Sequence, residues 1–97
     1  MKYLHNIDPE RVVMIERQIN KSAVYTVDGT VQYFEKSLVW FESKFRILTR
    51  CHRSYMVNPE FVEKVDGDTV HMKGGYRAML SKKEGYWKKK FQVATLH

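Results

Sequence analysis

The residue types most often used for catalysis and metal binding are few in this chain. They are His5, Cys51, His52, His71 and His97. No two of them stand at the spacing of a CxxC or HExxH motif, and neighbours such as Cys51 and His52 would point to opposite faces of a strand. A Cys–His nucleophilic pair also needs contact between the side chains and a third group that orients the histidine. The sequence therefore favours neither a metal site nor an enzyme and predicts no cofactor, with Cys51 as a half-buried strand residue.

Basic side chains gather in three short segments that are suited to contact with phosphate. The segments contain Arg50, His52 and Arg53, then Ser81, Lys82 and Lys83, then Lys88, Lys89 and Lys90. We predict that a helix begins at Ser81, which would turn its N–H groups and the two following lysines toward an anion. For the first segment, a solvated strand edge that carries charge against aggregation is the alternative.

The formal charge of +6 is distributed unevenly along the chain. Residues 1–43 hold five Lys and Arg against six Asp and Glu, whereas residues 44–97 hold twelve against five. Such a concentration is typical of proteins that bind a polyanion, most often nucleic acid and less often an acidic membrane surface, although a basic surface without a partner has the same composition. The 97 residues suffice for one small domain with little room for a deep pocket. No apolar run approaches membrane-spanning length, and one cysteine without a leader peptide predicts a cytoplasmic protein.

The segment 48–58, Leu-Thr-Arg-Cys-His-Arg-Ser-Tyr-Met-Val-Asn, carries the most specific pattern. It resembles the signature of the LytTR family of bacterial DNA-binding domains, in which an Arg-x-His-x-Ser-aromatic-x-Val-Asn run precedes a hydrophobic strand, a short hairpin and a Val-Ser-Arg-like element. Corresponding parts follow in order at 61–65, 69–73 and 79–83, and residues 13–16 resemble the first strand of the family. The resemblance covers roughly residues 10–92.

The resemblance implies a mainly β fold, with many short strands in small antiparallel sheets and one or two short helices. It also implies a bacterial transcription regulator, or its DNA-binding domain, that contacts double-stranded promoter DNA through loops and strand ends. Together with the basic segments, the predicted DNA-contacting residues are Asn20, Lys21, Ser22, Arg50, His52, Arg53, Ser81, Lys82 and Lys83. Because Lys82 stands where the family usually has arginine, we expect phosphate contact rather than bidentate guanine readout at that end.

Several alternatives remain open at this level. His52 would either contact a phosphate or be fixed by hydrogen bonds beneath Arg53, and Cys51 beside these basic groups would have a lowered pKa and act as an oxidation switch. The aromatic residues could form a stacking platform for single-stranded nucleic acid, but their spacing favours a hydrophobic core. These residues are Trp40, Phe41, Phe45, Tyr55 and Phe61. Rival functions are a single-stranded nucleic-acid or RNA-binding β module and a protein-interaction module with a basic face.

The elements that must position these residues are mostly strands. Strand patterns occur at 12–15, 23–27, 30–34, 47–48, 55–57, 61–65, 69–72 and 76–80, and helical patterns at 37–45 and 82–91. Hairpins are expected at Asp28-Gly29, as a type I′ turn, at Asp66-Gly67 and at Gly74-Gly75. We expect residues 1–9 to be a leader or linker remnant and residues 10–97 to be a single domain. Since family members usually carry a receiver domain, regulation would come from a protein partner or a second copy on tandem half-sites.

Overall fold

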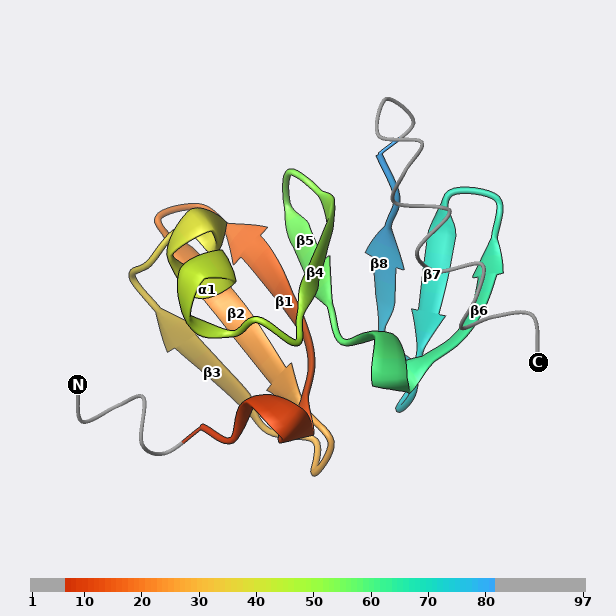
Figure 1. Ribbon diagram of the computed structural model, residues 1–97, viewed down its shortest axis with the longest axis horizontal. Coiled ribbons are helices and arrows are strands. Elements are labelled where there is room, and N and C mark those ends of the chain that lie inside the picture. The colour runs from red at the N-terminus through yellow and green to blue at the C-terminus, as the bar shows by residue number, and fades with distance from the viewer. Residues whose placement is uncertain (1–6, 82–97) are drawn as a thin grey trace.

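The computed structural model describes residues 7–81, which form two antiparallel sheets and one α-helix (Figure 1). Sheet A has the order β3-β2-β1-β5-β4 and sheet B the order β6-β7-β8. The strands are β1 (Val12–Gln18), β2 (Lys21–Thr26), β3 (Val31–Phe34), β4 (Thr49–His52), β5 (Tyr55–Val57), β6 (Val62–Asp66), β7 (Thr69–Met72) and β8 (Arg77–Met79). The helix α1 spans Leu38–Lys44, and short 3₁₀ turns span Pro9–Arg11 and Pro59–Phe61. The predicted fold class is confirmed.

The hairpin between β2 and β3 is present as predicted, but its turn type differs. A type I′ turn requires positive φ at both central residues, and within residues 7–81 the only non-glycine residue with positive φ is Asn20. Here Gly29 takes the left-handed conformation with φ 88°, its N–H donates to the carbonyl of Thr26 at 3.1 Å, and the Thr26 N–H donates to Thr30. The connection is therefore a three-residue loop that ends in a glycine, which keeps the strand register without strain at Asp28.

The helix is also confirmed, with a correction to the segment that follows it. Ser37 is the N-cap, and its hydroxyl accepts a hydrogen bond from the backbone N–H of Trp40 at 3.2 Å. The expected strand at 47–48 is wrong, because residues 46–48 form a turn in which the Leu48 N–H donates to the carbonyl of Phe45. Leu48 is apolar because it packs against the core under α1, and β4 begins only at Thr49. The expected helix at 82–91 lies outside the described residues.

Two hydrophobic clusters cover the two faces of sheet A. The first lies between sheet A and α1 and is formed by Ile7, Val12, Ile15, Val24, Leu38, Phe41, Phe45, Leu48 and Met56. The second lies between sheet A and sheet B and is formed by Val13, Met14, Cys51, Val57, Val70, Met72, Ala78 and Leu80. Because β1 contributes to both clusters, its first four residues are apolar without alternation, as expected for a strand buried on both faces.

The aromatic residues belong to these clusters, which confirms the core interpretation. Phe41 and Phe45 are buried, and Trp40 packs beside them with its ring 5.0 Å from that of Phe41, in an edge-to-face arrangement. Tyr55 and Phe61 pack against the second cluster. These side chains are therefore occupied in packing rather than arranged as an open stacking surface.

Cys51 differs from both expectations for it. It is fully buried rather than half-buried, and burial raises the pKa of its thiol to about 12. The nearby guanidinium of Arg50 acts in the opposite direction but does not outweigh the burial. A lowered pKa and an easily oxidised thiolate are thus wrong for this residue. Among residues 7–81 no group of three or more His, Cys, Asp or Glu is placed to hold a metal, and no helix there is long and apolar enough to span a membrane.

Candidate nucleic-acid interface

The three segments predicted to contact DNA begin at the same end of the two sheets (Figure 1). Two backbone hydrogen bonds hold their ends together. The N–H of Arg17, at the end of β1, donates to the carbonyl of Ser54 in the β4–β5 turn at 2.8 Å. The N–H of Ser81, just after β8, donates to the carbonyl of Cys51 in β4, also at 2.8 Å. The β1–β2 turn, the β4–β5 turn and the residues Leu80 and Ser81 after β8 therefore form one surface, which we call the turn surface.

The β1–β2 turn is tighter than the loop expected from the sequence. Gln18 pairs with Lys21, so only Ile19 and Asn20 lie outside the strands. Asn20 has φ 63°, a left-handed conformation that asparagine tolerates better than most side chains. Lys21 is exposed, and its Nζ lies 4.6 Å from the ring centre of Tyr33. Asn20 and Lys21 are thus presented to solvent at the tip of the hairpin.

Ser22 does not belong to this surface. Its side chain is fully buried, and its hydroxyl donates to the backbone carbonyl of Lys36 at 2.6 Å. The guanidinium of Arg17, opposite Ser22 in the strand pair, donates to the same carbonyl at 3.4 Å. Ser22 therefore fixes the end of β3 and the approach to α1, and the structure removes it from the predicted DNA contacts.

The β4–β5 turn presents Arg53 at its tip. A register shift between Arg50 and His52 marks a bulge in β4, which places the side chain of Cys51 in the core and leaves Arg53 exposed. The Nδ1 atom of His52 accepts a hydrogen bond from the backbone N–H of Ser54 at 3.1 Å. With Nδ1 as acceptor, the neutral ring carries its proton on Nε2. His52 is thus held within the turn, and Nε2 is the atom left to donate to a phosphate.

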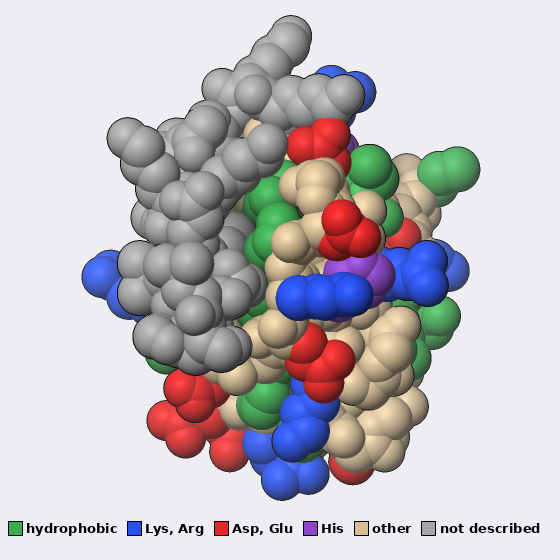
Figure 2. Space-filling model, turned by 90° about the vertical axis from the view of Figure 1, so that its right-hand side faces the viewer, with side chains coloured by type: hydrophobic (Ala, Val, Ile, Leu, Met, Phe, Trp, Pro, Cys, Tyr) green, Lys and Arg blue, Asp and Glu red, His purple; other side chains and the backbone are tan. Residues whose placement is uncertain are grey.

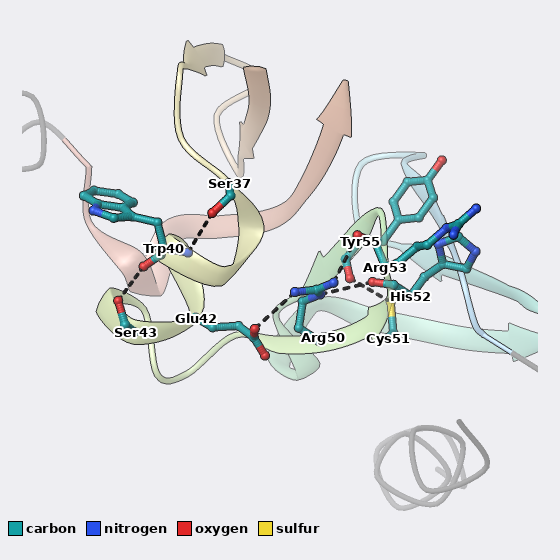
Figure 3. A network of polar contacts seen from close by, with 9 residues as sticks. All are labelled: Ser37, Trp40, Glu42, Ser43, Arg50, Cys51, His52, Arg53 and Tyr55. Atoms are coloured by element: carbon teal, nitrogen blue, oxygen red, sulfur yellow. Dashed lines mark hydrogen bonds and ion pairs between the residues drawn. The ribbon is translucent and has the colours of Figure 1, made fainter. Parts of the chain in front are cut away.

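Arg50 is engaged with the protein rather than directed outward. Figure 3 shows its guanidinium between α1 and the β4–β5 turn. It donates to the carbonyls of His52 at 3.1 Å and Arg53 at 3.0 Å, and it pairs with the carboxylate of Glu42 at 3.1 Å. The side chain of Arg50 is only 17% exposed. Its charge and its fork of donors therefore hold the backbone of the turn that carries Arg53.

The third segment starts at Ser81, the last described residue. Its backbone N–H is bonded to β4, so it is not one of the free N–H groups that the expected anion site required. The N–H of the preceding Leu80 donates to the carbonyl of Asp68 at 2.8 Å, which fixes this strand end on sheet B as well. Lys82 and Lys83 lie outside the described residues.

A carboxylate beneath the turn surface was missed by the sequence reasoning. Glu16, on the central strand, accepts hydrogen bonds from the hydroxyls of Tyr25 at 2.8 Å and Tyr55 at 3.3 Å. Burial raises the pKa of both tyrosines, and the neighbouring Glu16 raises it further. This group connects β1, β2 and β5 directly below the two turns. Tyr25 lies on β2 and Tyr55 on β5, whereas Glu16 lies on β1. Only the pairing of these strands could therefore have revealed the contact.

Charges of both signs are interspersed on the side of the molecule where sheet B lies (Figure 2). The strand register places Lys64, His71 and Arg77 in one row across this sheet. Asp66 lies on the strand that carries Lys64. Among the described residues, positive side chains thus occur on this side next to negative ones.

The family model of the LytTr DNA-binding domain matches residues 2–89, which is nearly the whole chain. The protein therefore belongs to the LytTr family of DNA-binding domains. Among solved structures, a similar one is the LytTr DNA-binding domain of a protein from Bacillus cereus described as a methyl-accepting/DNA response regulator. The two share the fold, with a TM-score of 0.75 and 23% sequence identity over 88% of this chain and 84% of the other. The comparison with curated proteins gave no significant match.

Proposed function

We propose that this domain binds double-stranded promoter DNA sequence-specifically, as a bacterial transcription regulator or its DNA-binding part, in the cytoplasm and without enzymatic activity. The observation that supports the proposal is the turn surface, where two backbone hydrogen bonds bring the β1–β2 turn, the β4–β5 turn and Ser81 to one end of the described fold. Residues 10–97 would act as a single domain. Ile7 would belong to the same domain, because it is buried in the first cluster. A second copy on tandem half-sites, or a regulatory protein, would be its further partner.

The contacts divide by chemistry. Asn20 would read a base edge from the β1–β2 turn, and the exposed guanidinium of Arg53 would donate in bidentate fashion to guanine O6 and N7 in the major groove. Lys21, His52 and the lysines that follow Ser81 would bind phosphates, which fixes the register of the protein on the duplex. Arg50, by contrast, would act on DNA only through the turn that it holds.

Two measurements test this function. A preferred duplex is first selected from a random library, and its affinity is then compared with that of a scrambled duplex at several salt concentrations. If about six phosphates are engaged, log affinity should fall against log salt with a slope of about −5. A slope near zero, or equal affinity for both duplexes, would contradict the proposal, and preferential binding of the single strands in competition would favour the single-strand module instead.

A matched pair of variants tests the assigned roles. Arg53→Ala should lower affinity for the selected duplex by about 1 to 3 kcal/mol and relax its sequence preference. Arg77→Ala removes the same charge from an exposed position on sheet B and should leave the sequence preference unchanged. Identical sequence profiles for the two variants would argue against Arg53 as a base reader.

A further inference from the structure

The most exposed large hydrophobic side chain among residues 7–81 is Ile19, which is 88% exposed at the tip of the β1–β2 turn. Single apolar residues on a surface are common, and exposure alone carries no meaning. Ile19 is unusual because of its position: it is one of the two residues of a tight turn, where glycine, asparagine, aspartate, serine and proline are the usual occupants. Neither packing nor the geometry of the turn explains an isoleucine here.

The neighbours of Ile19 in the hairpin are polar: Gln18 donates to Glu16, and the Nζ of Lys21 lies over the ring of Tyr33. Asn20 completes the turn, and Gln18 and Lys21 form the last strand pair below it. An asparagine side chain can donate to N7 of adenine and accept from its N6 amino group at the same time. The apolar group that an A·T pair presents in the major groove is the 5-methyl group of thymine. The two residues of the turn therefore match the two halves of an A·T base pair.

The geometry points to Ile19 as a reader of thymine: we propose that, with the turn in the major groove, its side chain packs on a thymine 5-methyl group beside the adenine contact of Asn20. This inference rests on the proposed duplex binding and adds the base class that the first turn prefers. A β-branched side chain suits the task, since its restricted χ1 leaves little rotamer freedom to lose on binding. The lysine at the base of the turn would contribute phosphate attraction without base preference.

The test is a double-mutant cycle between one side chain and one methyl group. In the duplex selected from a random library, each thymine is replaced singly by deoxyuridine, which removes only the methyl group. At one or two positions the wild type should bind about three- to fivefold more weakly, the effect of burying one methyl group. Ile19→Ala should bind the thymine duplex correspondingly less well and should lose nothing further with deoxyuridine at the same positions.

Val27→Ala is the matched control. Val27 is also exposed, at 38%, but it lies in the turn at the opposite end of β2, about 20 Å away by the rise of a six-residue strand. This variant should keep the full deoxyuridine effect. Because Ile19 is so exposed, Ile19→Ala should unfold at the same urea concentration as the wild type, so weakened binding would not reflect misfolding.

Three outcomes would overturn the inference. The first is that wild-type binding is unchanged whichever thymine is replaced by deoxyuridine. The second is that Ile19→Ala shows the same deoxyuridine effect as the wild type. In both cases the protein would still prefer the selected duplex. Either result refutes the role of Ile19 and leaves the proposed function standing. A library that yields no preferred duplex would refute the proposed function itself and the inference with it.

Discussion

Replacing Arg50 separates a contact with DNA from support of the turn that makes the contact. Arg50 donates to two carbonyls of the β4–β5 turn and pairs with Glu42, and its side chain is only 17% exposed. A net value of about 1 kcal/mol for each hydrogen bond, with up to about 1 kcal/mol for the half-exposed ion pair, gives a loss of about 2 to 3 kcal/mol in the free energy of unfolding for Arg50→Ala. Urea denaturation followed by tryptophan fluorescence measures this loss.

The DNA-binding assay then distinguishes the two roles. If Arg50 supports the turn, Arg50→Ala should relax sequence preference in the same way as Arg53→Ala, and the double variant should lose less affinity than the sum of the single losses. The salt slope should remain that of the wild type, because no phosphate contact is removed.

Arg50→Lys provides the decisive comparison. Lysine keeps the charge but lacks the planar fork that reaches two carbonyls and a carboxylate together. A supporting role predicts that Arg50→Lys is nearly as defective as Arg50→Ala in both stability and sequence preference. The reasoning would be refuted if lysine restored binding while Arg50→Ala left stability unchanged and made the salt slope shallower by about 0.9, since that is the pattern of a phosphate contact.

Two further predictions concern titration and reactivity. Hydrogen bonds from Thr26 and Thr30 lower the pKa of Asp28 to about 2, which is below its value in the unfolded chain. The carboxylate therefore stabilises the fold above about pH 4, and this stabilisation is lost as the pH falls through 2. The difference in urea midpoint between the wild type and Asp28→Asn should therefore be constant from pH 7 to pH 5 and shrink toward pH 2, and a difference independent of pH would contradict the assigned hydrogen bonds. With its pKa raised to about 12, the buried Cys51 thiol should react with iodoacetamide at pH 8 only in urea, and peroxide should leave DNA binding unchanged; rapid alkylation of the native protein would show that the thiol is accessible.

The local elements of this fold were largely predictable. Ser37 as an N-cap, the hairpins at Asp28-Gly29 and Gly74-Gly75, and most of the strands depend on residues close in sequence. Errors arose where tertiary contacts changed the outcome. Residues 47–48 have a strand composition, but packing under α1 and a turn bond to Phe45 displaced the start of β4.

The candidate site shows the same division. Strand alternation indicates which side chains share a face, but it does not say whether a face is exposed. Sheet A is covered by α1 on one face and by sheet B on the other, so Ser22 and Cys51 became interior residues although they adjoin residues at the turn surface. For Arg50, the proximity of Glu42 and of two turn carbonyls could not be inferred from a cluster of basic letters.

The sequence by itself determined the class of this protein: a small, basic, mainly β domain whose segment 48–58 carries the LytTr pattern. The tertiary structure decided which of the predicted contact residues are exposed at turns. Arg53 and Asn20 lie at the tips of turns, whereas Arg50 holds the turn that carries Arg53, and Ser22 is bonded to the segment between β3 and α1. The physical reason is that a basic or hydroxyl side chain binds whichever acceptor it meets, and only the long-range packing of strands and helix determines whether a backbone carbonyl or the solvent lies within its reach.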